Sequence, residues 1–233
     1  APFAVFGAIA YTVSLQGLGV IVDYSRLVGS FFLALFILWA VLIAAGFLVL
    51  GPRVFKLIWD VRAPGLIAFA TASSEAAYPR LLEQLERHGV ANRVVSFVLP
   101  LGYSFNLDGS MMYCTFAVMF IAQAMGIHLD IGQQIGMLLL LMVTSKGIAG
   151  VPRASLVVIS ATLPAMGMKP EWIALVLAVD AFMDMGRTAT NVIGNSIASA
   201  VIAKWEGLLS DPTKDTPAVE SVLGPEESQP ANL

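Results

Sequence analysis

Two long stretches of this 233-residue chain carry no charged side chain. The first covers residues 1–22, and the second runs from Leu27 to Pro52. Because an α-helix rises about 1.5 Å per residue, either stretch can cross a hydrocarbon layer of about 30 Å. Charged residues make up only 12% of the chain, whereas soluble domains carry about 25%. We therefore expect an all-α polytopic membrane protein with spans at 1–22 and 27–52, joined by a turn at Asp23 and Arg26.

Two later regions are too interrupted to cross a membrane as single helices. In 63–93 the apolar run ends at Ala72, about half-way through a bilayer, where Ser73-Ser74-Glu75 follows. In 131–168 a similar apolar run is broken by the segment 145–153, which is rich in glycine. Broken backbone is tolerated at that depth only inside protein or beside a water-filled cavity. We therefore expect both regions to form re-entrant helical hairpins.

Each hairpin is followed by a stretch long enough to cross, at 94–127 and 172–204. Both hairpin tips end in Pro-Arg, and both crossings contain an Asn-x-x-Gly sequence, at 106–109 and 191–194. This similarity predicts an inverted repeat of two hairpins, each followed by a broken transmembrane helix. Many secondary transporters are built in this way.

The charge distribution indicates the orientation and excludes some partners. Lysine and arginine gather between residues 53 and 93, which the positive-inside rule places in the cytoplasm. Residues 206–233 hold six acidic residues and one basic residue, and we expect a disordered cytoplasmic tail. The rest of the chain has a net charge of only +2, so nucleic acid is not an expected partner. The expected surroundings are the lipid bilayer of a bacterial inner (plasma) membrane.

The single cysteine, Cys114, excludes an internal disulfide and a cysteine-cluster metal site. We expect Cys114 and the methionines to pack in the interior or to face lipid. His88 and His128 fall in loops and are expected to be solvated. The chain begins with Ala1-Pro2-Phe3, and we expect it to be a fragment that does not function without N-terminal helices missing here.

The clearest functional signal lies in the last crossing. Asp180, Asp184, Arg187 and Asn191 follow one another at steps of four, three and four. They therefore share one helix face, which Asn195 continues. An ionised group at the bilayer centre costs several kcal/mol unless it pairs or lines a polar cavity. An internal salt bridge that only fastens helices is one interpretation. We favour a site for a small anionic solute, because a guanidinium binds a carboxylate with two parallel hydrogen bonds and a nearby carboxylate would suit an ammonium group.

Asp108 is a second intramembrane carboxylate, and Gly109 beside it favours local unwinding. The freed carbonyl oxygens and Asp108 would bind a small cation. The alternatives are an aspartate that carries a proton, or one that bonds to a neighbouring helix. At the hairpin tips, Ser73, Ser74 and the backbone amides of 149–152 would suit an anion at the N-termini of half-helices.

These residues resemble the dicarboxylate/amino acid:cation symporter family, which includes the archaeal aspartate and the mammalian glutamate transporters. The resemblance runs from residue 1 to about 205 and corresponds to the C-terminal half of the family's length. Four motifs carry it, and they are specific: Thr71-Ala72-Ser73-Ser74, Asn106-Leu107-Asp108-Gly109-Ser110, Gly147-Ile148-Ala149-Gly150-Val151-Pro152, and Asp184-Met185-Gly186-Arg187-Thr188-Ala189-Thr190-Asn191-Val192.

The resemblance implies roles for individual residues. Arg187 and Ser110 would hold the side-chain carboxylate of the solute, and Asp184 its amino group. Asn191 and the tip at Ser73 and Ser74 would bind the α-carboxylate, with Gly150 and Val151 as the outer cover. A sodium site would use Asp108 and Asn106. The full set that we expect to take part in cation or proton coupling is Asp108, Asn106, Asp180, Asn195, Ser104, Ser145 and Lys146.

The resemblance also implies how the whole protein works. The hairpins and the last two crossings would move as one body against a scaffold, in an elevator-like alternating-access movement. It implies a homotrimer, no catalytic residues, and no cofactor other than the coupling ion, H⁺ and/or Na⁺.

Three departures from the family pattern bear on the coupling ion. Sodium-coupled members have an aspartate where this chain has Asn195, an apolar residue at Lys146 and a methionine at Leu107. Losing a carboxylate and gaining an ammonium both make the region less suitable for sodium. We therefore hypothesise that coupling is at least partly to protons, carried by Asp108, Asp180 or Asp184.

The choice of solute remains between two classes. The Ser-Ser-Glu tip and Ser145-Lys146-Gly147 resemble the bacterial C4-dicarboxylate branch, whose solutes are succinate, malate and fumarate. Asp184 favours glutamate and aspartate, because a carboxylate repels a solute that has no ammonium; we prefer this class. Glu75 and Arg153, at the two tips, could pair with each other or affect gating.

Other classes of protein are less consistent with the pattern. A helical channel or structural bundle predicts a continuous polar stripe rather than two matched hairpins. An intramembrane protease would need Asp180 and Asp184 as a catalytic dyad, and one turn apart on a single helix is a poor geometry for sharing a water molecule.

Overall fold

The structure, a computed structural model, describes residues 7, 10, 14, 17–105, 107–146 and 152–211. Within these ranges the chain is helical without a strand, and an isolated bridge pairs Val90 with Leu209. The all-α class is therefore confirmed for this part of the chain. The elements are α2 (Gly19–Leu50), α3 (Arg53–Asp60), α4 (Arg62–Thr71), α5 (Ser74–Arg87), α6 (Asn92–Phe105), α7 (Asp108–Ala124), α8 (Ile131–Thr144), α9 (Ala154–Ala165), η1 (Pro170–Ile173), α10 (Ala174–Leu177) and α11 (Asp180–Trp205).

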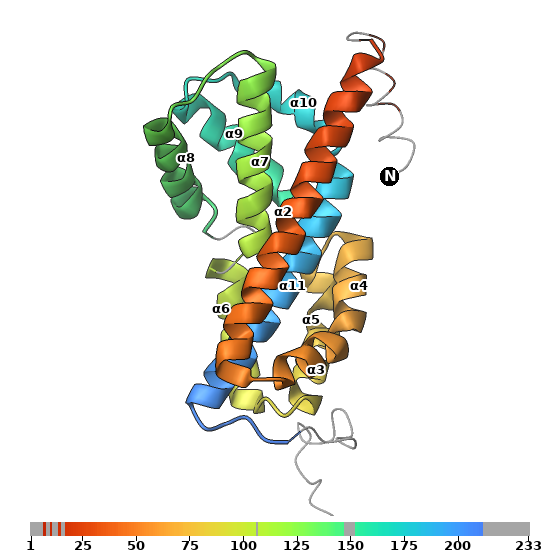
Figure 1. Cartoon of the computed structure of the whole chain (residues 1–233), viewed down its shortest axis with the longest axis vertical. Helices are drawn as coiled ribbons and strands as arrows, with labels where there is room; N and C mark the ends of the chain where they lie inside the picture. Colours follow the sequence, from red (N-terminus) through yellow and green to blue (C-terminus); the bar gives the residue numbers. More distant parts are fainter. Residues whose placement is uncertain are drawn as a thin grey trace, which may run out of the picture.

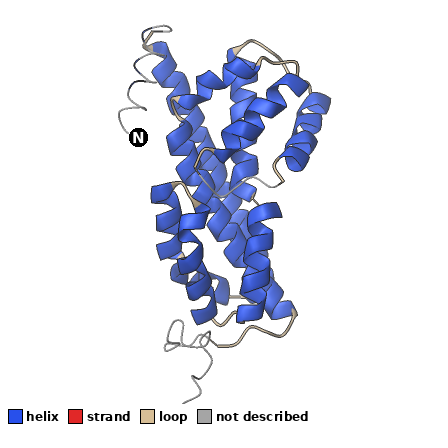
Figure 2. Ribbon diagram, turned by 180° about the vertical axis from the view of Figure 1, so that it is seen from behind, coloured by secondary structure: helices blue, strands red, loops and turns tan. Residues whose placement is uncertain are grey.

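Two long helices form the axis of the molecule. α2 and α11 pack against each other along its length, and the shorter helices divide into two groups around them (Figure 1). Helices α3 to α6 surround the lower half, while α7 to α10 surround the upper half. The view from behind shows the same division, with loops joining the helices mainly at the two ends and near the middle (Figure 2).

Helix α2 begins earlier than the sequence predicts. The turn expected at Asp23 and Arg26 is wrong, because both residues lie inside α2. Their side chains are on the exposed side of the helix, while Tyr24 and Leu27 are buried. The Tyr24 hydroxyl donates a hydrogen bond of 2.8 Å to the carbonyl of Leu175. Two charged residues thus fit in a helix whose opposite face packs inward.

Both of the later long stretches are divided into shorter helices. The chain leaves helical geometry at Leu107, between α6 and α7. The stretch 172–204, expected as one crossing, is interrupted at residues 178–179, so that α11 begins at Asp180. Both interruptions lie at or beside an aspartate that the sequence singles out.

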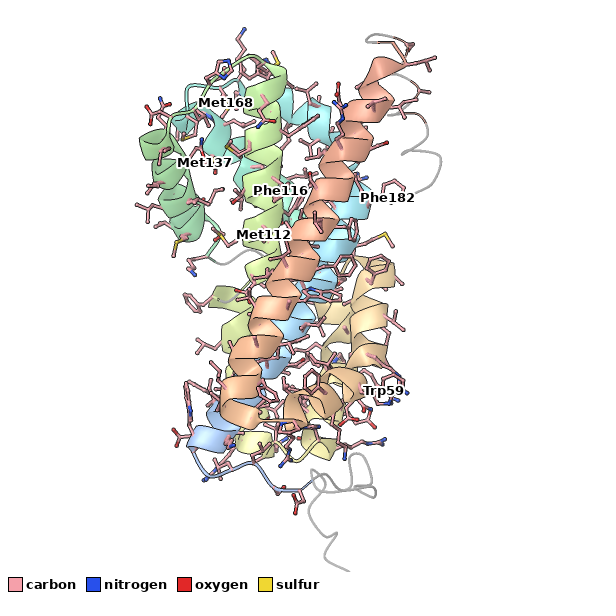
Figure 3. The ribbon with its side chains drawn as sticks, viewed as in Figure 1. Trp59, Met112, Phe116, Met137, Met168 and Phe182 are labelled. Carbon is pink, nitrogen blue, oxygen red and sulfur yellow. The ribbon has the colours of Figure 1, made fainter. Side chains whose placement is uncertain are left out.

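The buried apolar residues form two clusters that share no residue. The upper cluster joins the first half of α2 to α7, α8 and α9, and includes Met137 and Met168 (Figure 3). The lower cluster joins the end of α2 and the second half of α11 to α3 through α6. Residues 184–191 of α11 belong to neither cluster. The middle of α11 therefore lies between two apolar regions.

Apolar side chains also cover the outside of the molecule. By length and composition, α2 and the stretch Asn92–Ala124 can each cross a membrane. Leu33, Phe36 and Leu48 of α2 are each more than half exposed. Exposed apolar surface of this kind indicates contact with lipid or with other protein.

His88, expected to be solvated, is instead buried at the lower end of the molecule, so that expectation is wrong. Its Nδ1 lies 2.7 Å from a carboxylate oxygen of Asp60, and its carbonyl accepts a hydrogen bond of 2.7 Å from Arg53. Arg53 Nε also donates to His88 Nε2, at 3.4 Å. The C-terminal segment reaches the same cluster, because Ser210 N donates to the carbonyl of Gly89. His128, in contrast, is exposed in a loop as expected.

The free energy of unfolding is expected to depend on pH through His88. Burial lowers the pKa of His88 from 6.5, aided by the charges of Arg53 and Lys56 and opposed by the hydrogen bond and charge of Asp60. The unfolded chain then binds a proton more readily than the folded chain, so stability falls as the pH drops through 6.5. His88→Gln is expected to reduce this pH dependence of Tm in the solubilised full-length protein, and His128→Gln to leave it unchanged. An equal pH dependence in all three proteins would contradict the prediction.

Candidate functional site

The middle of α11 carries a buried ion pair. Asp184 and Arg187 are almost completely buried, and Arg187 Nε lies 2.5 Å from Asp184 Oδ1. Residues three apart on a helix face the same side, so the pair follows from the local sequence. Removing one partner of a buried pair typically costs about 3–5 kcal/mol, because the other charge is left uncompensated.

The beginning of α7 is bonded to this ion pair through Ser110. Arg187 Nη1 and Asn191 Nδ2 each donate a hydrogen bond of 3.1 Å to the Ser110 hydroxyl. The amide oxygen of Asn191 accepts hydrogen bonds from the backbone N–H groups of Gly109, at 2.9 Å, and Ser110, at 3.3 Å. The first N–H groups of a helix have no partner within it. Asn191 thus acts as a helix cap supplied by another helix.

Two glycines allow α7 and α11 to approach this closely. A Cβ atom on Gly109 would lie 2.1 Å from the backbone oxygen of Arg187, and one on Gly194 would lie 2.5 Å from a carboxylate oxygen of Asp108. Asp108 is the first residue of α7, where a negative charge interacts favourably with the helix dipole. Asn195 is buried against α6, with its amide oxygen beside Gly102.

Asp180, one turn before Asp184, holds two further partners. The Tyr113 hydroxyl donates a hydrogen bond of 2.5 Å to Asp180 Oδ1, and Arg153 Nε lies 3.1 Å from Asp180 Oδ2. The backbone N–H of Arg153 donates to Asp184 Oδ2 at 2.8 Å. The centre of the molecule therefore contains two ion pairs, Asp184–Arg187 and Asp180–Arg153, which the backbone N–H of Arg153 links.

Among the buried polar atoms that lack a hydrogen-bond partner in the described part of the chain, two that also make no ion pair belong to residues expected to bind the solute. They are Arg187 Nη2 and the hydroxyl oxygen of Ser74. Buried polar atoms are normally hydrogen-bonded. A guanidinium nitrogen and a hydroxyl that lack partners are suited to the oxygens of an acidic solute.

Three expected coupling residues lie around the break between α6 and α7. The Lys146 ammonium donates a hydrogen bond of 2.7 Å to the carbonyl of Phe105, the last residue of α6. The Ser145 hydroxyl is 3.2 Å from the sulfur of Met111 and 3.4 Å from the carbonyl of Met142. Ser104 is half-buried in the last turn of α6.

The structure accordingly brings together some of the expected site residues. Asp184, Arg187, Asn191 and Ser110 form one network, which Asp180 joins through Arg153. Ser73 has a structural role as the N-cap of α5, where its hydroxyl accepts from the N–H of Ala76. Three expected residues, Asn106, Gly150 and Val151, lie outside the described residues.

Besides the contacts of Arg153, sequence reasoning missed two contacts in and beside the network. Tyr113 follows Ser110 by three positions, so the helical period could have placed both on one face of α7. Trp39 of α2 donates a hydrogen bond of 2.8 Å from its indole N–H to the Thr190 hydroxyl. No local pattern predicts this contact, because it depends on the packing of α2 against α11.

Comparison with known proteins identifies related sequences. A family model described as the sodium:dicarboxylate symporter family matches residues 1–205. The proton/sodium-glutamate symport protein of Bacillus subtilis (strain 168) is 44% identical over 216 residues, which cover 93% of this chain and 50% of the relative. The C4-dicarboxylate transport protein of Stenotrophomonas maltophilia (strain R551-3) is 45% identical over 210 residues, covering 90% of this chain and 47% of the relative. The chain thus spans about half the length of these curated relatives.

Proposed function

The chain belongs to the sodium:dicarboxylate symporter family, a family of transporters and not of enzymes, and on this premise we propose that the whole protein is a secondary active symporter. It takes up glutamate and aspartate together with protons and/or sodium ions. The observation that carries the proposal is the buried Arg187, whose Nη2 has no hydrogen-bond partner among the described residues. Arg187 is paired with Asp184 through Nε, and its remaining donor at Nη2 is suited to an oxygen of an anionic solute.

The proposed site uses the network around Ser110. Arg187 and Ser110 bind the side-chain carboxylate of the solute, and Asp184 binds its ammonium group. Asn191 and the Ser74 hydroxyl bind the α-carboxylate. For Asn191 and Asp184 to take these roles, the solute must replace some of their present contacts. Asn191 accepts a hydrogen bond from Gly109, and Asp184 pairs with Arg187.

The proposed membrane arrangement follows the inverted repeat. Helices α4 and α5 form one re-entrant hairpin, and α8 and α9 form the other, each followed by a divided crossing. The first hairpin enters from the cytoplasm, so its two ends and the C-terminal tail lie on the cytoplasmic side, and the site lies near mid-membrane. The hairpins and crossings move together in an elevator-like manner in a homotrimer embedded in a bacterial inner membrane. The exposed apolar residues of α2 support burial against lipid or the N-terminal half.

A second candidate solute is a C4-dicarboxylate such as succinate, malate or fumarate. One observation favours it. Asp184 already interacts with Arg187 through one oxygen and with the N–H of Arg153 through the other. The repulsion that this carboxylate would exert on a solute without an ammonium is therefore reduced.

Uptake by the reconstituted full-length protein tests the proposal. Saturable, stereoselective uptake of aspartate or glutamate under an imposed ion gradient is expected. If succinate displaces labelled aspartate and Asp184→Ser leaves transport unchanged, the amino-acid assignment fails in favour of the dicarboxylate. Current without saturable uptake would identify a channel.

We propose further that coupling is at least partly to protons, with Asp108, Asp180 or Asp184 as the carrier. The hydrogen bond from the Lys146 ammonium to the Phe105 carbonyl supports this proposal. The break after α6 leaves the Phe105 carbonyl without a partner in its own helix. Because the Lys146 ammonium binds this carbonyl, it is less available to sodium.

Lys146→Met is therefore expected to increase the dependence of uptake on sodium, because it frees the Phe105 carbonyl. The measurement is aspartate uptake under separate sodium and proton gradients. The matched control is Lys169→Met, which changes an exposed lysine before η1. Wild-type uptake that a sodium gradient drives at clamped pH, and that a proton ionophore does not affect, would contradict proton coupling.

A further inference from the structure

Arg153 stands at an unusual position, immediately before α9 and with a positive backbone φ of 64°. Residues other than glycine rarely adopt this left-handed conformation. A residue held in such a conformation is maintained by its surroundings. The contacts of Arg153 therefore indicate what holds it there.

Those contacts go to both carboxylates at the beginning of α11. The side chain binds Asp180, at 3.1 Å between Nε and Oδ2. The backbone N–H binds Asp184, at 2.8 Å. Arg153 is thus the residue through which the start of α9 contacts the acidic end of the α11 network. It does not pair with Glu75, whose side chain is exposed at the other hairpin tip.

Arg153 changes the net charge of the group of ionised side chains at the start of α11. Without it, Arg187 pairs with Asp184, no cation pairs with Asp180, and the group of three charges is net negative. With it, two carboxylates face two guanidiniums and the charges balance. Asp180 and Asp184 are fully buried, so an uncompensated charge there would act strongly on any solute bound nearby.

This balance bears on which solutes the site accepts. Aspartate and glutamate carry an ammonium group that offsets one carboxylate of the protein. Succinate carries two negative charges and no ammonium, so a net negative site would repel it. The Arg153 side chain is 53% exposed although its partner Asp180 is buried. Part of the guanidinium therefore remains accessible to a ligand.

We propose that Arg153 determines solute specificity: by neutralising Asp180 and donating to Asp184, it allows the site to accept a dicarboxylate that lacks an ammonium group. This inference rests on the proposed symport function and adds one residue to it. Arg153 acts on the solute through the two aspartates, as a positioning and charge-balancing residue.

A series of substitutions in the reconstituted full-length protein tests the inference. Glutamine at position 153 keeps the backbone N–H and must adopt the same left-handed backbone conformation, but it removes the positive charge. Arg153→Gln is expected to raise the apparent KM for succinate relative to that for aspartate by about tenfold, the effect of about 1.4 kcal/mol. Arg153→Lys is expected to retain most of the wild-type ratio. Arg153→Glu is expected to change the ratio further than glutamine does.

The first hairpin offers a matched control. Arg80 also follows a proline, but the expectation that this pair ends the hairpin tip is wrong, because Pro79 and Arg80 lie inside α5. The Arg80 side chain is 49% exposed and pairs with Glu83 on its own helix. Arg80→Gln is expected to leave both KM values unchanged. A role in stability alone would alter uptake of both solutes equally, so the ratio of the two KM values separates the explanations.

Every outcome of these uptake measurements either supports or overturns the inference about Arg153. A succinate-to-aspartate ratio that follows the charge at position 153 supports the inference. Equal changes for both solutes, equal loss of both activities, or no change would overturn it. Wild-type protein that transports aspartate but excludes succinate would overturn it too, while leaving the proposed function intact. Wild-type protein that transports neither solute would refute the proposed function itself.

Discussion

Replacing Arg187 with glutamine is expected to lower solute uptake by at least about a hundredfold, equivalent to about 2.7 kcal/mol. The guanidinium donates from Nη1 to Ser110, pairs through Nε with Asp184 and leaves Nη2 for a ligand. Glutamine has neither the charge nor the forked geometry that binds a carboxylate with two parallel hydrogen bonds. The measurement is the initial rate of aspartate uptake by the reconstituted full-length protein.

Two further variants separate binding from folding. Arg187→Lys keeps the charge but loses the forked geometry, so its uptake is expected to be intermediate or low. In Arg187→Gln alone, Asp184 is left buried and uncompensated, which destabilises the protein. Adding Asp184→Asn removes that charge, and the double variant is expected to recover Tm without recovering uptake. Uptake within about threefold of wild type in Arg187→Gln would refute the assigned role.

Replacing Gly109 with alanine is expected to destabilise the full-length protein strongly. The new Cβ would lie 2.1 Å from the carbonyl oxygen of Arg187. That neighbour is backbone in the middle of α11, so neither a rotamer change nor a small side-chain movement relieves the contact. Overpacking of this kind costs about 1–3 kcal/mol and occasionally more. The expected result is a Tm several degrees lower, or no folded protein, in thermal unfolding of the solubilised protein.

Gly136 in α8 provides the control for this prediction. A Cβ there meets nothing within 4 Å, and alanine is favoured over glycine in a helix by about 1 kcal/mol. Gly136→Ala is therefore expected to leave Tm unchanged or to raise it slightly. If Gly109→Ala matched Gly136→Ala in Tm and yield, the close approach of α7 to α11 would be wrong.

The sequence predicts those parts of the site that depend on local periodicity. The spacing of Asp184, Arg187 and Asn191 places them on one helix face, and all three are buried and bonded to the start of α7. Ser110, in contrast, enters the expected site only through the family motif. An isolated serine carries no signal of its own, because its function depends on which helix packs beside it.

The sequence could not predict contacts that depend on how distant segments meet. Arg153 reaches Asp180 across 27 positions, and a charged residue after a proline is equally consistent with an exposed position on a helix surface, such as Arg80 in α5. The same limitation explains His88. Its burial depends on Asp60 and Arg53 of α3 and on the C-terminal segment, none of which its immediate neighbours reveal.

The two apolar clusters share no residue, and the polar stretch 184–191 of α11 lies between them. Each half is therefore stabilised by its own apolar contacts, while at the junction, where α2 and α11 run through, α7 is joined to α11 by directional hydrogen bonds. Such bonds weaken steeply when their geometry is disturbed. A solute bound at this junction would contact both halves. The protein would therefore become more rigid and more stable as a larger fraction of its sites is occupied.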